Sequence, residues 1–114
     1  MKTNTELILR DLENIKHNNY LVIVEGKKDK KALNEFGITN VVFLENRPLF
    51  EVIENVNYGD VVILTDLDVE GKKLFNKLRY HLQRKGVKLH NQIRGTLFRS
   101  KLRHIEGLIT YLKR

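Results

Sequence analysis

The amino-acid sequence predicts an α/β protein: a three-layer sandwich with a central, mostly parallel four-stranded sheet and helices on both faces. Short, continuously apolar runs recur along the chain, which is the pattern of strands buried on both faces. Segments with helical spacing of apolar residues separate these runs, and such alternation favours parallel strands joined by right-handed crossovers. The length of 114 residues is that of one structural domain.

The first half of the chain carries three helices and two strands. The helix predicted over 3–17 begins with a capping box of threonine and glutamate, and an apolar strand follows over 20–24. An aspartate can cap the short helix over 29–36, and the glycine after it suits a left-handed helix end. A second strand covers 41–44. The only proline of the chain can occupy the first turn of a third helix over 48–56.

The second half repeats the alternation around an acidic loop. The apolar run 61–64 is the third buried strand, and the acidic loop 66–71 follows it. A fourth helix begins near this loop and ends at Gly86. Residues 87–92 alternate well enough for a fourth strand nearer an edge of the sheet. A last helix begins near residue 105 or 106, and its apolar positions are Leu108, Ile109 and Leu112.

The composition excludes several classes of protein. The chain has no cysteine, so it can form no disulfide framework, no thiolate zinc site and no cysteine nucleophile. No apolar run approaches the roughly 20 residues that a membrane span needs. Acidic residues interrupt the N-terminal segment, where a signal peptide needs an apolar stretch. We therefore expect a cytoplasmic protein that has no membrane partner.

Charge is distributed unevenly along the chain. Residues 1–71 carry 8 basic and 13 acidic residues, whereas residues 72–114 carry 13 basic residues and a single acid. A segment this basic favours a polyanionic partner, most simply nucleic acid, either RNA or DNA. A lysine-rich surface that only keeps the protein soluble is the simpler alternative.

Three acids follow the ends of predicted strands. Glu25 comes directly after the first strand, and Asp66 and Asp68 follow the third. Ligands of parallel sheets bind at the carboxyl ends of the strands, so these carboxylates converge if the two strands are neighbours. Like charges packed together need neutralisation, and a magnesium ion prefers carboxylates, water and phosphate oxygens. The alternative is that each acid caps a helix or lies on the surface.

Two phosphate-handling folds fit these acids poorly. A haloacid-dehalogenase-type phosphatase also has an Asp-x-Asp after a buried strand, but it needs a second acidic motif further on. The only acid after the loop that ends at Gly71 is Glu106. A two-component receiver needs an acidic pair after its first strand and a fifth strand that ends in lysine, and neither is visible.

The sequence most closely resembles the Toprim domain. Leu21-Val-Ile-Val-Glu25-Gly26 matches an apolar strand that ends in Glu-Gly, and Val62-Ile-Leu-Thr-Asp66-Leu-Asp68-Val-Glu70-Gly71 matches a strand that ends in Asp-x-Asp-x-x-Gly. The resemblance covers roughly residues 20 to 108. Within the family, the chain is similar to small stand-alone Toprim proteins and to the front domain of a ribonuclease that matures 5S ribosomal RNA. The predicted organisation is an N-terminal helix over 1–19 and a Toprim domain over 20–114, within one structural domain.

The resemblance implies a set of site residues. Glu25 would be the general acid/base and also a metal ligand, while Asp66 and Asp68 would hold one or two Mg²⁺ ions against the scissile phosphate. Predicted phosphate contacts are the glycines and basic residues near these acids: Gly26, Lys27, Lys28, Gly71, Lys72, Lys73 and Arg103. We expect the wider basic surface to include Lys77, Arg79, Arg84, Lys85, Arg94, Arg99 and Lys101. Pairing with neighbouring acids is the alternative for Lys27 and Lys28.

Two functions remain open from the sequence. One is a magnesium-dependent nuclease, including a ribonuclease that acts on structured RNA. The other is a non-catalytic nucleic-acid-binding module, which would depend on a protein partner for activity. The complete set of three acids favours the nuclease, and the lack of an attached recognition domain favours the module. A homodimer is compatible with both.

Overall fold

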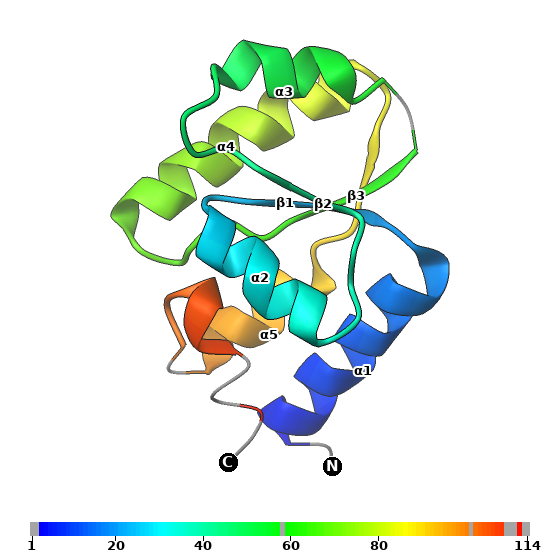
Figure 1. Ribbon diagram of the computed structural model, residues 1–114, viewed down its shortest axis with the longest axis vertical. Coiled ribbons are helices and arrows are strands. Elements are labelled where there is room, and N and C mark those ends of the chain that lie inside the picture. Colours follow the sequence, from blue (N-terminus) through cyan, green and yellow to red (C-terminus); the bar gives the residue numbers. More distant parts are fainter. Residues whose placement is uncertain (1–2, 58, 101, 109–111, 113–114) are drawn as a thin grey trace.

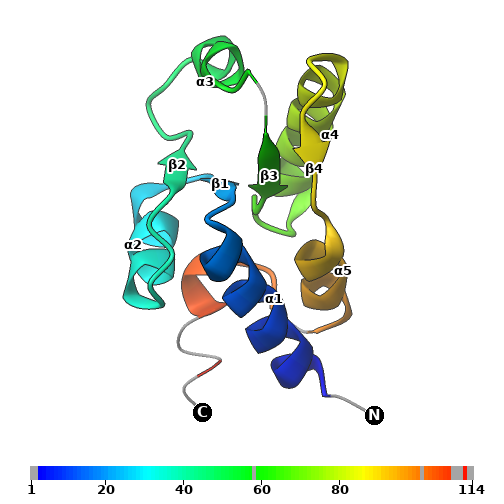
Figure 2. The same ribbon diagram turned by 90° about the vertical axis from the view of Figure 1, so that its right-hand side faces the viewer.

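In the computed structural model, the chain forms the predicted three layers. The structure describes residues 3–57, 59–100, 102–108 and 112. All neighbouring strands pair in parallel, in the order β2-β1-β3-β4. The strands are β1 (Leu21–Val24), β2 (Val41–Phe43), β3 (Asp60–Ile63) and β4 (Lys88–Leu89), and Figure 2 shows them side by side in this order.

Helices cover both faces of the sheet. On one face lie α1 (Asn4–Asn18), α2 (Lys27–Glu35), α5 (Gln92–Arg99) and the 3₁₀ helix η1 (Ile105–Gly107). On the other lie α3 (Leu49–Asn55) and α4 (Val69–Arg84). Figure 1 shows α3 and α4 above the sheet and the other helices below it. This arrangement confirms the predicted fold class.

Alternation along the strands fills both cores. In β1, Val22 and Val24 face the core beneath α1 and α5, while Ile23 faces the core beneath α3 and α4. Burial on both faces explains why the strands are continuously apolar in sequence. Because β1 and β3 are neighbours, the residues that follow them meet at the same edge of the sheet.

The segment that begins at the fourth predicted strand differs from the prediction. The strand predicted over 87–92 is wrong in length, because only Lys88–Leu89 pair and α5 begins at Gln92. The sequence reading missed α5 altogether. The predicted last helix starts with the 3₁₀ turn η1 over residues 105–107, Leu108 and Leu112 are helical, and Ile109 lies outside the described residues. No helix in the described part of the chain is long and apolar enough to cross a membrane.

A buried carboxylate lies where α1 packs against α5. Asp11 is 7% exposed, and its Oδ2 has no hydrogen-bond partner among the described residues. Burial raises the pKa of Asp11, and the positive charges of Arg10 and Arg99 only partly oppose this effect. The folded state therefore binds the Asp11 proton more tightly than the unfolded state does. Stability contributed by this residue is present at low pH and is lost as the pH rises through the carboxyl range.

We expect Asp11→Asn to raise the free energy of unfolding at pH 7 by about 1 kcal/mol, because the neutral amide removes an ionised group from the interior. The gain should shrink as the pH falls towards about 4, where the carboxyl of the wild type holds its proton. Urea unfolding at several pH values measures it. Glu13→Gln, on the exposed side of the same helix, is the control. An equal gain in both variants, or a gain that grows at low pH, would contradict the assignment.

Candidate metal and phosphate site

The loop after β3 is built around a helix cap. Asp68 is the N-cap of α4, and its Oδ1 accepts a hydrogen bond from the Gly71 N–H at 2.8 Å. The hydroxyl of Thr65 donates to the Gly71 carbonyl at 2.7 Å. Glu70 lies in the first turn of α4, 3.5 Å from Lys73 in an exposed ion pair. The cap fixes where the Asp68 carboxylate stands.

Gly71 lets this loop close tightly. A Cβ atom at position 71 would lie 2.0 Å from the carbonyl oxygen of Asp66 and 2.5 Å from its carbonyl carbon. Atoms do not approach so closely, so only glycine allows the first turn of α4 to pack against Asp66. Gly71 is therefore required for the packing of this loop, whether or not it also contacts phosphate.

Glu25 joins the end of β1 to this loop. Its Oε2 accepts a hydrogen bond of 2.6 Å from the Asp66 N–H. Burial is the main reason that the pKa of Glu25 is raised, the hydrogen bond from Asp66 opposes the rise, and the negative charges of Asp66, Asp68 and Asp29 add to it. The carboxylates that follow β1 and β3 therefore interact electrostatically.

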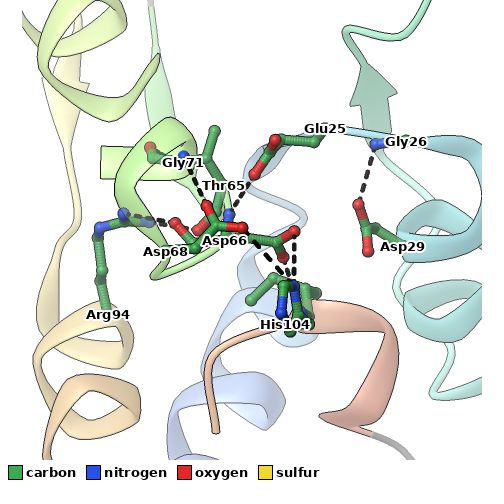
Figure 3. A network of polar contacts seen from close by, with 10 residues as sticks. Glu25, Gly26, Asp29, Thr65, Asp66, Asp68, Gly71, Arg94 and His104 are labelled. Carbon is green, nitrogen blue, oxygen red and sulfur yellow. Dashed lines mark hydrogen bonds and ion pairs between the residues drawn. The ribbon is translucent and has the colours of Figure 1, made fainter. Parts of the chain in front are cut away.

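The chain after α5 brings a histidine to the two aspartates. Asp66 Oδ1 accepts a hydrogen bond of 2.9 Å from the Ile105 N–H, and Asp66 Oδ2 lies 3.3 Å from His104 Nδ1. The same nitrogen lies 3.9 Å from Asp68 Oδ2. Figure 3 shows these groups together with Glu25. His104 is therefore a site residue that the acids after the strands do not indicate in the sequence.

Arg94 holds the loop from the opposite side. Its guanidinium donates to the Thr65 carbonyl at 2.5 Å and to the Asp66 carbonyl at 3.1 Å (Figure 3). The side chain is buried and packs 4.3 Å from the centre of the Phe75 ring. Burial lowers the pKa of Arg94, and the charges of Glu25 and Asp66 oppose this effect. The expectation that Arg94 belongs to an exposed basic surface is therefore wrong.

The donor set fits a divalent cation. One potential ligand atom each from Asp66, Asp68 and His104 lies within 4.8 Å of the others. The two carboxylates are 17% and 43% exposed, so an ion and its waters can reach them. The two carboxylates suit Mg²⁺ or Mn²⁺, whereas an imidazole nitrogen is a ligand typical of Zn²⁺, Fe²⁺ or Ni²⁺. Glu25 lies beside this group and adds negative charge to it.

A cavity of about 740 Å³ adjoins the acids. Glu25, Asp66 and His104 are among the residues that line it, and Lys27 and Lys28 belong to its lining as well. Gly26 also lines it and is the N-cap residue of α2, where its N–H donates to Asp29 Oδ2 at 2.9 Å. The sequence reading did not include Arg47, which lines the same cavity and lies 4.3 Å from the centre of the Phe43 ring.

The other predicted phosphate contacts lie elsewhere around the loop. Lys73 pairs with Glu70 on the exposed surface of α4. The ammonium of Lys72 and the guanidinium of Arg103 both lie near the Phe98 ring, at 5.0 and 5.6 Å from its centre. Lys101 lies outside the described residues. The structure thus separates a cavity beside α2 from a second basic region between α4 and α5.

These observations define an α/β protein with an acidic centre at the carboxyl ends of two neighbouring parallel strands. The sequence profile of the Toprim domain matches residues 19–91, so the chain belongs to the Toprim family, as predicted. A Toprim domain implies a nucleic-acid-related function and usually binds Mg²⁺.

Its relatives are small proteins of the UPF0292 group. The chain is 35% identical to UPF0292 protein PH1700 of Pyrococcus horikoshii over 76% of this chain and 67% of that protein. It is 32% identical to UPF0292 protein Mbar_A0484 of Methanosarcina barkeri over 96% of this chain and 80% of that protein. A solved structure from Aquifex aeolicus superposes with a TM-score of 0.81 at 30% identity, covering 93% of this chain and 98% of that one. The similarity to the 5S ribosomal RNA ribonuclease stays a prediction.

Proposed function

We propose that the protein is a magnesium-dependent nuclease. The observation that carries this proposal is the junction of β1 and β3, where Glu25 bonds the backbone of Asp66 beside a cavity that lysines also line. A polyanionic substrate approaches three carboxylates only if a cation neutralises them. Bound magnesium would supply that neutralisation and would polarise the phosphate.

In this proposal the side chains have distinct roles. Asp66 and Asp68 hold the ion, because a hydrogen bond to each carboxylate fixes its position. Glu25 accepts a proton from the attacking water or donates one to the leaving oxygen, and burial raises its pKa, so it holds a proton more readily than an exposed glutamate does. Lys27 and Lys28 contact substrate phosphates from the start of α2.

One observation favours a second candidate, a binding module without catalysis. Asp66 and Asp68 already have structural partners, since Asp66 anchors the chain at Ile105 and Asp68 caps α4. The acids would then be retained for folding, and a protein partner would supply any activity. Cleavage measurements with and without magnesium separate the two candidates.

The test is a cleavage screen on labelled RNA hairpins, ribosomal-RNA precursors, and single- and double-stranded DNA. Each substrate is incubated with the protein in Mg²⁺, in Mn²⁺ and in EDTA. The nuclease proposal predicts cleavage that requires the metal on at least one substrate class. Binding without cleavage on every substrate would contradict it and favour the module.

We also expect Asp66→Asn combined with Asp68→Asn to weaken Mg²⁺ binding by about 100-fold or more, because losing outer partners of a metal ligand alone costs about 10- to 100-fold. The amide oxygens can still accept the hydrogen bonds from Ile105 and Gly71, so the fold should persist. Calorimetric titration measures the affinity. Glu51→Gln combined with Glu54→Gln, at two exposed positions of α3, makes the same two-charge change away from the site. An unchanged Mg²⁺ affinity in the double variant would show that Asp66 and Asp68 do not form the metal site.

A further inference from the structure

A second groove, of about 380 Å³, lies between α4 and α5. Two aromatic rings and two amides line it together with a leucine and an arginine: Phe75, Phe98, Asn76, Asn91, Leu67 and Arg94. Leu67 stands between the two aspartates in sequence, and its N–H donates to the Arg103 carbonyl at 2.8 Å. The wall of this groove is therefore continuous with the loop that carries the acidic centre.

Phe98 is the most unusual residue of the groove, because 52% of this large apolar side chain is exposed. Two cations lie against it, Lys72 at 5.0 Å and Arg103 at 5.6 Å from the ring centre. The Arg103 guanidinium is held in place by hydrogen bonds of 2.9 Å to the carbonyls of Ser100 and Leu102. Among the described residues, neither Lys72 nor Arg103 has an ion pair with a carboxylate.

We infer that this groove binds an unpaired nucleobase, stacked on the Phe98 ring, with the adjoining phosphates beside Lys72 and Arg103. The inference rests on the proposed function and narrows its substrate class to nucleic acid with a single-stranded segment next to the cleaved bond. An aromatic ring stacks on any base and contributes affinity without reading sequence. The bases of an intact duplex are stacked on each other and cannot reach such a ring.

The composition of the groove favours a nucleotide over an apolar ligand. The amides of Asn76 and Asn91 can donate to and accept from the edge of a base. Among the described residues, no acidic side chain lines this groove, in contrast to the cavity beside Glu25, and two cations stand at the exposed ring. Aromatic and cationic groups side by side match the alternating bases and phosphates of a single strand.

Fluorescence tests the stacking directly, because the chain has no tryptophan. Phe98→Trp places the only indole of the protein in the groove. Twelve-nucleotide oligo-dT and oligo-rU, added in EDTA to prevent cleavage, should quench its emission, whereas a 12-base-pair duplex should not. Phe50→Trp, at a phenylalanine of α3 that is 62% exposed, is the matched control and should not respond. Equal quenching by duplex and single strand, or by both variants, would overturn the inference.

The affinity for single strands is the second readout. It is measured by fluorescence anisotropy of the same oligonucleotides, now carrying a fluorescent label. Phe98→Ala should weaken single-strand binding by roughly 5- to 100-fold, whereas Phe98→Tyr, which keeps the ring, should change it by less than about threefold. Phe50→Ala should have no effect. Unchanged affinity in Phe98→Ala would overturn the groove while leaving metal-dependent cleavage by the wild type intact. If single strands quench Phe98→Trp but the wild type cleaves no substrate in the magnesium screen, the groove is retained and the nuclease proposal is refuted.

Discussion

Replacing Gly71 with alanine is expected to lower the free energy of unfolding by about 3 kcal/mol or more and to abolish metal binding. The added Cβ would lie 2.0 Å from the Asp66 carbonyl oxygen, which is backbone and cannot swing aside as a flexible side chain would. Relief requires the first turn of α4 to move away from the loop. That movement breaks the Asp68 cap and displaces both aspartates from their positions beside His104.

Chemical unfolding and magnesium titration on the same preparation measure both effects. Gly95→Ala is the matched control, because a Cβ at that helical position would meet nothing closer than Arg99 at 3.8 Å. Alanine is also the better helix former, so this variant should be stabilised by up to about 1 kcal/mol. A Gly71→Ala protein that unfolds like the wild type and binds Mg²⁺ would contradict this prediction. It would show that the loop tolerates the methyl group and that the close packing of α4 against the Asp66 backbone is not required.

The strands could be predicted because burial on both faces leaves a signature in the sequence. Val22, Ile23 and Val24 are all apolar since each faces one of the two cores. Helix α5 left no comparable signature. Glycine interrupts it at position 95, its N-cap Asn91 makes no side-chain hydrogen bond, and its buried residues include Arg94 and Thr96. Polar burial hides a helix from any reading based on apolar spacing.

The acids of the site could be predicted from their places after strands, but their partners could not. His104 and Ile105 lie 38 and 39 residues from Asp66 in sequence, and only the path of the chain beneath the sheet brings them together. Arg94 looked like part of a basic surface because charge counts do not report burial. Its carbonyl partners, Thr65 and Asp66, belong to the backbone of the loop, which no residue pattern reveals.

Glu25→Gln is expected to lower cleavage by roughly 100- to 10,000-fold while nucleic-acid affinity stays the same or rises. The amide oxygen can still accept the Asp66 N–H, so the junction of β1 and β3 should survive. The variant loses the group that accepts and donates a proton, and it removes one negative charge from a cavity that receives phosphate. Single-turnover cleavage and anisotropy on one substrate separate turnover from binding.

Glu45→Gln makes this result specific, because Glu45 lines the same cavity and accepts a hydrogen bond from the Lys27 N–H at 3.2 Å. Both variants change the cavity charge equally, but only Glu25 contacts the loop of the aspartates. A loss of cleavage confined to Glu25→Gln therefore assigns proton transfer to that carboxylate. Similar cleavage rates in both variants and the wild type would mean that the acids near the cavity only shape its charge, and proton transfer would have to come from another group.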